Sequence, residues 1–290
     1  MKRFIVALGL FCALTESGVS AWGDDGHKIV CAIAQKILSS SDRAEVERLT
    51  RLYRTPDKLS FQFFTSACVF ADTARRRARA GDPGWTQFSP FENFHFLNVP
   101  RTTTTIGAGA CGGDCVLEGI RRHFDRLRNH TLGDPERTEA LIFLGHWVGD
   151  AHQPLHVSFE DDRGGNLIKP ITGGFYQSDH LHQVWDSGII KAAHGTVDWF
   201  TFAGHLKASI TPAQRKEWLK ADSRAWAQES YDVSLTADVQ YCRRTATACN
   251  AIAGGRTLSK AYQDEFADPV EVRLQKAGVR LADLIRRALH

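Results

Sequence analysis

The sequence lacks the features of several large protein classes. No internal repeat, low-complexity segment or linker rich in proline and glycine divides the 290 residues, which argues against repeat architectures. Beyond the first 21 residues, no apolar run is long enough to span a bilayer. The formal net charge is only +3, unlike that of a protein that coats DNA. Strand signals are few as well, so we expect a mainly α fold with one substantial core.

The N-terminus has the pattern of a signal peptide. A basic start, Met1-Lys2-Arg3, precedes an apolar run at 4–14 and the small residues Val19-Ser20-Ala21. A buried first helix is the alternative, but nothing caps it. Cleavage is predicted between Ala21 and Trp22, which leaves a single domain over 22–290 that is secreted or periplasmic. Its formal charge would be +2, because Lys2, Arg3 and Glu16 depart. Any attraction of the protein for phosphate groups must therefore come from a local cluster of positive charge and not from its net charge.

Six cysteines remain after this cleavage, and an even number in an exported chain predicts disulfides. Cys111 with Cys115, and Cys242 with Cys249, are close enough in sequence to close local loops. Cys31 with Cys68 is then the remaining pair, although six cysteines allow fifteen connectivities. Thiolate zinc binding is the rival interpretation, but these spacings are not those of zinc fingers.

Most of the chain shows helical periodicity. The run at 140–150 is apolar on all sides, which predicts a helix at the centre of the molecule. Gly, Thr and Asp mark loops at 81–90, 101–113 and 160–174, and the one strand signal covers 94–99. The other expected helices cover 27–38, 116–127, a segment from Thr211-Pro212 through Trp226, and a segment from Asp268-Pro269 through Leu289.

Histidine and aspartate recur inside the apolar segments. His146 and Asp150 are four residues apart on the central helix, so they share one face. His182 and Asp186 repeat this spacing. A buried carboxylate needs a partner, and imidazole and carboxylate are the ligands of zinc. Three further candidates lie in apolar or proline-bounded contexts: Asp72, His95 and His156.

Each of these features has a plainer interpretation when it is taken alone. A lone His95 is more often a core histidine with a satisfied hydrogen bond, and a lone His146–Asp150 pair is more often a helical hydrogen bond. Together they favour a metal site. His152 and His180 are predicted to orient ligands by hydrogen bonds. The remaining histidines are predicted to be solvated: His123, His130, His194, His205 and His290.

Seven short motifs resemble those of a known family, the zinc-dependent single-strand-specific nucleases with 3′-nucleotidase activity, found in fungi, plants and bacteria. They occur in the family's order up to about residue 186, and the last hundred residues match only in helical character. The motifs are Trp22-Gly-Asp-Asp-Gly-His27, Phe70-Ala-Asp-Thr-Ala-Arg75, Phe94-His-Phe-Leu-Asn98, Gly145-His-Trp-Val-Gly-Asp150, Gln153-Pro-Leu-His156, Gly164-Gly-Asn166 and Leu181-His-Gln-Val-Trp-Asp186.

The resemblance implies three zinc ions in a mainly helical domain with disulfide-closed loops. It assigns one ion to Asp72, His95, His146 and Asp150. It assigns a second ion to the free amine and carbonyl of Trp22 with His27 and the bridging Asp150. It assigns the third ion to His156, His182 and Asp186. Arg75 matches the arginine that faces the phosphate, and Asn166 matches a position near the substrate.

The charges are consistent with this assignment. Three zinc ions bring six positive charges, and the three aspartates return three, so the cleft stays positive and attracts phosphate. Zinc also lowers the pKa of bound water to about 7. The expected reaction is in-line attack on phosphorus with Asp72 orienting the nucleophile and Arg75 stabilising the phosphate. The leaving group is O3′, so the products carry 5′-phosphates.

Two positions depart from the family pattern. The aspartate that pairs with the base edge in the fungal enzymes is Asn98 here, and the aliphatic residue opposite Phe96 is replaced by Arg163. Phe96 would stack a base, with core packing as the alternative, and Arg163 is expected to be a solvated loop residue. The sequence therefore does not predict which bases the enzyme prefers.

The expected partners are single-stranded DNA and RNA and 3′-mononucleotides, with no membrane association and a monomeric state. The alternative function is a phospholipase C-type zinc phosphodiesterase acting on lipid head groups, since that family also uses three zinc ions and an N-terminal tryptophan. A further alternative is a non-enzymatic zinc-binding protein, but such a protein would need neither Arg75 nor an open metal position. Asn129-His-Thr131 is a glycosylation sequon whose use depends on the host.

Overall fold

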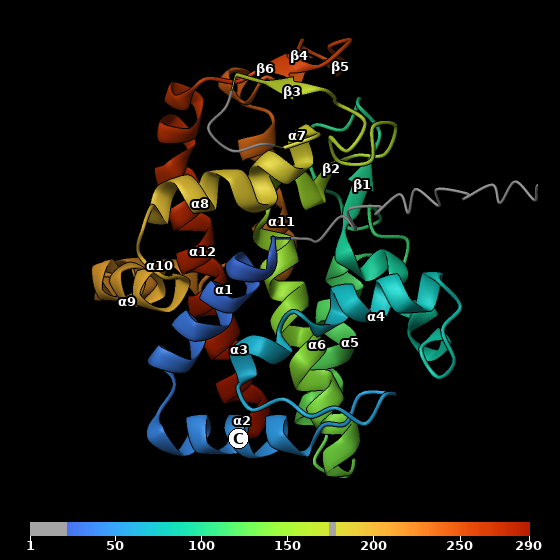
Figure 1. Cartoon of the computed structure of the whole chain (residues 1–290), viewed down its shortest axis with the longest axis vertical. Coiled ribbons are helices and arrows are strands. Elements are labelled where there is room, and N and C mark those ends of the chain that lie inside the picture. The colour runs from blue at the N-terminus through green and yellow to red at the C-terminus, as the bar shows by residue number, and fades with distance from the viewer. Residues whose placement is uncertain (1–21, 174–177) are drawn as a thin grey trace, which may run out of the picture.

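The computed structural model describes residues 22–173 and 178–290 and is mainly helical, as predicted (Figure 1). The signal peptide predicted over 1–21 lies outside these residues. No helix in the described ranges has the length and apolar character that a membrane span requires. The helices are α1 Asp24–Ile37, α2 Ser40–Leu52, α3 Phe64–Ala67, α4 Phe70–Arg79, α5 Val116–Arg128, α6 Asp134–His152, α7 Leu181–Gln183, α8 Ile189–His194, α9 Trp199–Ser209, α10 Pro212–Trp218, α11 Ser223–Ser234 and α12 Lys260–Leu289.

Helix α6 is the central element (Figure 1). Residues 140–152 are buried without interruption, as expected for a helix that is apolar on all sides. Among the described helices, six pack on it: α1, α2, α4, α5, α11 and α12. A polar side chain on this part of α6 is thereby removed from water and must find its partners inside the protein.

The strands are short and form three two-stranded pairs. β1 (Leu97–Val99) and β2 (Val157–Phe159) are parallel, with Leu97 opposite Val157. The strand predicted at 94–99 is confirmed only from Leu97, because Phe94 and His95 end a 3-10 stretch, η1 (Thr86–His95), that also occupies part of an expected loop. The remaining pairs are β3 (Ile171–Thr172) with β6 (Arg256–Thr257), parallel, and β4 (Cys242–Arg244) with β5 (Cys249–Ala251), antiparallel.

The three predicted disulfides are confirmed: Cys31–Cys68, Cys111–Cys115 and Cys242–Cys249. The first joins α1 to the end of α3 across 37 residues, and the other two close local loops. All six described cysteines are therefore oxidised in pairs, and the thiolate zinc interpretation is wrong.

Two helix predictions in the C-terminal third were wrong. The segment expected to run from Thr211 to Trp226 is two helices, because α10 ends at Trp218 and Asp222 caps α11 by accepting a hydrogen bond from the Ala225 N–H at 2.9 Å. The last helix begins at Lys260, and Pro269 lies inside it. Tyr262, Phe266 and Val270 form an i, i+4, i+8 stripe whose members are all buried, so core packing overrides the start signal at Asp268-Pro269.

Candidate metal centre

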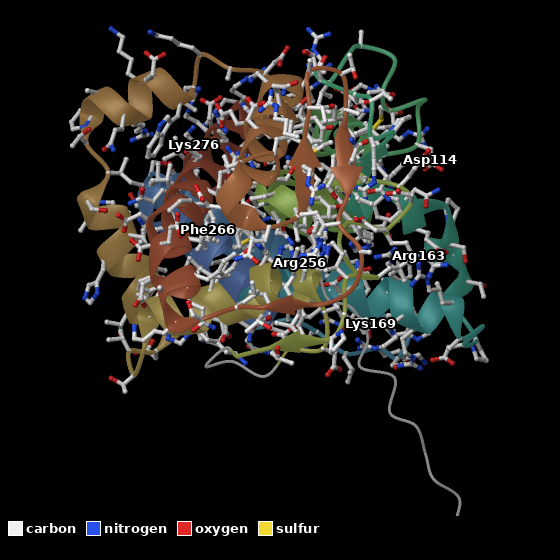
Figure 2. All side chains as sticks on the ribbon, turned by 90° about the horizontal axis from the view of Figure 1, so that it is seen from above. Asp114, Arg163, Lys169, Arg256, Phe266 and Lys276 are labelled. Carbon is white, nitrogen blue, oxygen red and sulfur yellow. A yellow bond between two sulfur atoms is a disulfide. The ribbon has the colours of Figure 1, made fainter. Side chains whose placement is uncertain are left out.

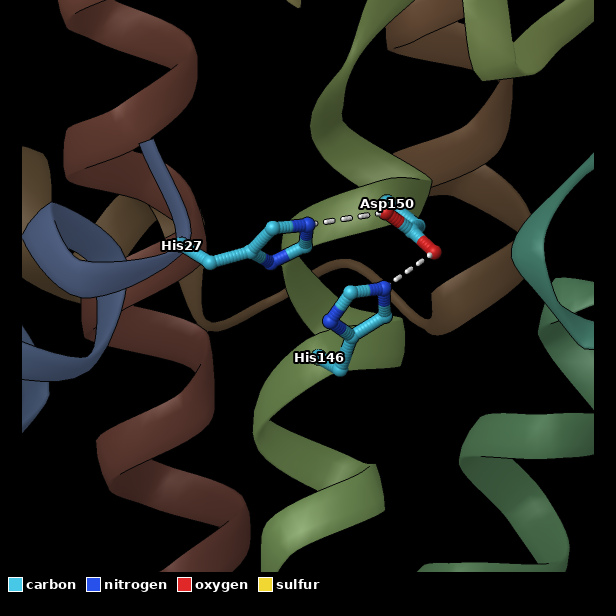
Figure 3. A group of neighbouring side chains, drawn as sticks. All are labelled: His27, His146 and Asp150. Carbon is cyan, nitrogen blue, oxygen red and sulfur yellow. Dashed lines mark ion pairs between the residues drawn. The ribbon is translucent and has the colours of Figure 1, made fainter. Parts of the chain in front are cut away.

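Asp150 stands at the centre of a group of histidines. One of its oxygens, Oδ1, lies 3.3 Å from Nε2 of His27 (Figure 3). The other, Oδ2, lies 3.3 Å from Nε2 of His146 and 3.2 Å from Nδ1 of His95. His146 is one helical turn before Asp150 on α6, whereas His27 comes from α1 and His95 from the end of η1. All four residues are buried.

Gly149 lets His27 approach this closely. The His27 ring stacks on that of His146 with 3.8 Å between centroids. A Cβ at Gly149 would lie 2.7 Å from Nδ1 of His27, which is closer than real contacts allow. The glycine in the sequence Trp147-Val-Gly-Asp150 is therefore required by the site rather than by the helix, where glycine is unfavourable.

Asp72 completes a second group with His95 and His146. Its Oδ1 lies 3.5 Å from Nδ1 of His95 and 3.7 Å from Nε2 of His146. In this group and in the group of His27, His146 and Asp150, one possible ligand atom from each residue lies within 4.8 Å of the others. His146 therefore belongs to both groups, and the two possible ion positions are adjacent.

The third group contains His156, His182 and Asp186. Nε2 of His156 and Nε2 of His182 are 3.0 Å apart, and the latter lies 3.3 Å from Asp186 Oδ2. His156 is the last residue of η2 (Pro154–His156), which follows the end of α6. Asp186 lies in a π-helical segment, η3 (Val184–Gly188). Such segments are frequent at functional sites.

Backbone carbonyls fix the orientation of three of these rings. The Nδ1–H groups of His146, His156 and His182 donate to the carbonyl oxygens of Cys68, His95 and Gly164, at 2.7, 2.6 and 2.6 Å. The unprotonated Nε2 of each ring then faces the centre. This arrangement is the one that metal-binding histidines adopt.

Glycine is needed at position 164 to supply the carbonyl that holds His182. Gly164 has φ +66°, and a Cβ there would lie 2.4 Å from the carbonyl oxygen of Leu155. Asp162 holds the loop around Gly164, because its Oδ1 accepts hydrogen bonds from Gly165 N–H and Tyr241 O–H. Tyr241 comes from the segment before β4, and sequence reasoning assigned it no role.

The chemistry of the donor set fits metal ions. Within the described residues, neither nitrogen of His27 and neither carboxylate oxygen of Asp150 makes a hydrogen bond, although all four atoms are buried. Burial raises the pKa values of Asp150 and Asp186 well above the usual range and lowers those of His27 and His95 well below it. Proton binding alone therefore does not stabilise this buried cluster of side chains. Metal cations placed between neutral imidazoles and ionised carboxylates would stabilise it.

Arg75 faces the same centre from α4. Its Nε is buried and makes no hydrogen bond with described residues. Burial lowers its pKa and Asp72 opposes that effect, and a guanidinium stays charged in proteins. Its Cζ lies 5.4 Å from the Phe96 ring centroid, so the predicted phosphate-binding and base-stacking residues are neighbours. A half-buried cation that forms no ion pair with the described residues and lies beside acidic ligands is suited to an anionic substrate.

The other predicted substrate residues are half-buried. Asn98 lies in β1 opposite Ser158. Asn166 donates to the Arg163 carbonyl at 2.7 Å, while its Oδ1 is buried and has no partner among the described residues. Arg163 is exposed, as expected, with φ +54°. Figure 2 looks onto the end of the molecule that carries this loop and labels Arg163.

Several polar residues behave differently from the sequence predictions. His123 is buried, not solvated: its Nδ1 lies 2.8 Å from the Gly119 carbonyl and 3.2 Å from the Trp147 indole nitrogen. His152 contacts Arg280 at 2.8 Å rather than a candidate ligand. Gln153 was quoted as part of a motif but given no role of its own, and its amide donates to Asp186 Oδ1 at 2.5 Å. Its place in that motif, between the apolar helix and Pro154, was the available signal.

Trp22 is fully buried, and its indole N–H donates to the Gly149 carbonyl at 2.8 Å. The adjacent Gly23 N–H donates to the Asp186 carbonyl at 2.7 Å. These two contacts place the first described residues between the group around Asp150 and the group around Asp186. The structure thus brings together, in one buried centre, all eight side chains that the sequence analysis singled out as metal ligands.

Comparison with known proteins gives a consistent result. The sequence profile of the S1/P1 Nuclease family matches residues 22–290. Endonuclease 3 of Arabidopsis thaliana is 29% identical over 99% of this chain and 95% of its own length. Nuclease P1 of Penicillium citrinum is 26% identical over 91% of this chain and 96% of its own. Nuclease S1 of Aspergillus oryzae is 25% identical over 90% of this chain and 89% of its own.

Proposed function

The chain belongs to the S1/P1 nuclease family and is a hydrolase of phosphodiester bonds, and on that premise we propose that it uses three zinc ions to cut single-stranded DNA and RNA. The proposed products carry 5′-phosphates, and 3′-mononucleotides are further substrates. The proposed enzyme is an exported monomer with one nuclease domain over 22–290. The lipid phosphodiesterase alternative is not retained, because the family match covers the chain from Trp22 to His290.

The observation that carries the proposal is the convergence of three His/Asp groups around Asp150 and beside Arg75. Asp72, His95, His146 and Asp150 would hold one ion. Trp22, His27 and Asp150 would hold a second, and His156, His182 and Asp186 a third. Zinc bound there would acidify water and offset the charge of the phosphate and of the leaving oxygen.

The side chains around these groups supply the rest of the chemistry. The Arg75 guanidinium is positioned to donate to a phosphate oxygen, because its Nε has no partner among the described residues. Asp72, three residues before Arg75 on the same face of α4, would orient the attacking water. Asn166 would accept a hydrogen bond from the substrate through its free Oδ1. A buried site of this kind excludes bulk water, which strengthens each of these interactions.

A preference for unpaired substrate follows from the position of Phe96. Its ring is half-buried next to Arg75, so a base that stacks on it must leave its own helix. Unstacking costs a few kcal/mol in a duplex and little in a single strand. Faster cleavage of single strands than of duplex is therefore expected.

Metal removal combined with product analysis tests the proposal. The protein is dialysed against a chelator, its metal content is measured, and a single-stranded oligonucleotide is offered with and without added zinc. We expect three zinc ions per chain, loss of cleavage on chelation, a lower Tm because the ions join α1, α4, α6 and η3, and recovery with zinc. Cleavage by a metal-free sample, or 3′-phosphate ends on the products, would contradict the proposal.

Base preference is expected to depend on Asn98. An asparagine offers both a donor and an acceptor, whereas an aspartate only accepts. We predict that Asn98→Asp sharpens discrimination among the four 3′-mononucleotides by about 10-fold, since one hydrogen bond to a charged group is worth about 1.5 kcal/mol or more. kcat/KM for each nucleotide is the measurement. Unchanged ratios would show that this position does not contact the base.

A further inference from the structure

A second feature lies outside the metal centre: a groove of about 440 Å³ along the outer side of α1. Its lining comes from α1, α2, Phe63, α3 and the start of α9, and includes none of the candidate ligands. Three aromatic side chains lie on it, Phe63, Trp199 and Phe200. Phe63 is 66% exposed and Phe200 is 51% exposed. Rings left this open to water are available to a ligand.

The charge on this groove is positive. Lys36 Nζ lies 4.0 Å from the Phe200 ring centroid, and Arg43 donates to two backbone carbonyls. Neither cation forms an ion pair with any described carboxylate. Glu47 is the single acidic residue among the lining residues, and it is paired with Arg51 at 3.5 Å. A ligand with flat apolar faces and negative charges would match this surface.

The groove shares Ser66 with a second cavity of about 460 Å³. Asp24 and Asp72 are among the residues that line this second cavity, and Asp72 is also a candidate metal ligand. Lys28 lines that second cavity, and its Nζ lies 5.9 Å from the ring centroid of Trp199.

Helix α1 provides one wall of the whole path. Lys28, Ala32 and Lys36 lie on one face of it at spacings of four residues, over a length of about 12 Å. Figure 1 shows α1 between α3 and α9.

We infer that the groove defined by Phe63, Trp199, Phe200, Lys36 and Arg43 binds unpaired nucleotides of the same strand whose phosphate occupies the metal centre. The aromatic rings stack bases, and the two cations neutralise backbone phosphates. The inference rests on the proposed nuclease function and adds to it a substrate-binding subsite. It predicts that affinity depends on the length of the single strand, because a dinucleotide in the metal centre cannot reach the groove.

The test compares two substrates with one double variant. For Phe63→Ala combined with Phe200→Ala, we expect KM for a single strand of about 12 nucleotides to rise at least about fivefold, the loss of one stacked base. kcat should stay unchanged, and so should both constants for a dinucleotide. Lys36→Ala should weaken the salt dependence of KM for the long substrate, with a slope in log salt lower by about 0.7.

Matched controls come from exposed residues that line neither cavity. Leu219→Ala removes an exposed apolar side chain, and Lys216→Ala removes an exposed lysine of α10; both should leave every constant unchanged. If the wild-type protein cleaves both substrates but the double variant keeps the wild-type KM for the long strand, the inference is overturned while the proposed function stands.

Light scattering adds a measurement of the oligomeric state. A wild-type dimer that the double variant converts to monomer would make the groove a contact between two copies and would also overturn the inference. A wild-type protein that cleaves neither substrate would instead contradict the proposed function itself.

Discussion

Asp150→Asn is expected to lower kcat/KM for single-stranded DNA by on the order of 10³-fold or more, with loss of bound zinc. The carboxylate lies within 3.3 Å of nitrogens from His27, His95 and His146. It is the only carboxylate that the proposal gives to two ions. An amide keeps the shape but loses the negative charge and one acceptor. Loss of a single preorganised electrostatic contact already costs about 10²–10³-fold.

The stability of the same variant distinguishes a metal role from a packing role. Burial raises the folded-state pKa of Asp150 above its unfolded value, so in metal-free protein this carboxyl destabilises the fold at every pH above the unfolded pKa of about 4. Asparagine removes that penalty. Metal-free Asp150→Asn should therefore melt no lower than metal-free wild type, whereas added zinc should raise Tm much less in the variant.

Asp264→Asn is the matched control, because Asp264 is exposed and the ion pair it forms within the described part of the chain is with Lys260 on α12. It should retain wild-type activity, zinc content and Tm. An Asp150→Asn protein that keeps three zinc ions and activity within tenfold of wild type would refute the central position of Asp150.

A single extra residue before Trp22 is expected to cost about one zinc ion per chain and at least about 100-fold in activity, with the fold retained. The proposed ligand is the α-amine of Trp22, which exists only after the Ala21–Trp22 bond is cut. In the extended protein that nitrogen is an amide and a poor ligand. His27, Asp150 and the Trp22 carbonyl would then have to hold the ion without the amine. Loss of contacts that only orient a ligand costs about 10–100-fold in metal affinity or activity, and loss of a direct ligand should cost at least as much.

The variant Trp22→Phe distinguishes the role of the α-amine from the role of the indole side chain. The indole N–H donates to the Gly149 carbonyl inside the core, so phenylalanine should lower stability by about 1 kcal/mol while the amine still binds. If packing alone were the role of Trp22, the extended protein would be fully active and hold three zinc ions. Mass spectrometry must show that the extension is uncut, and the same residue added after His290 serves as the control.

If the amine is a ligand, export and activation are one event. An enzyme that cuts single-stranded RNA would remain inactive until its N-terminal segment is removed. The proposal draws support from the burial of Trp22 and from the family match that begins at this residue.

Much of the candidate site was predictable from the sequence because it depends on short-range patterns. His146 with Asp150, and His182 with Asp186, are polar pairs at i, i+4 inside apolar segments, and such pairs demand a partner. The local disulfides follow from cysteines four and seven residues apart. The helix boundaries in the C-terminal third failed because start signals such as Asp268-Pro269 compete with packing that the local sequence does not record.

The sequence alone predicts the mainly helical class, the buried central helix, the two local disulfides and the His/Asp pairs, since periodicity and spacing act within a few residues. Trp22 and His27 were assigned as ligands only through the resemblance to the family. The folded structure was needed to show that His146 belongs to two groups, that Gln153 donates a hydrogen bond to Asp186, and that His123 is buried. It also shows that Ser66 lines both the aromatic groove and the neighbouring cavity that has Asp72 in its lining. Those relations connect segments tens of residues apart, and close packing rather than local pattern brings them together.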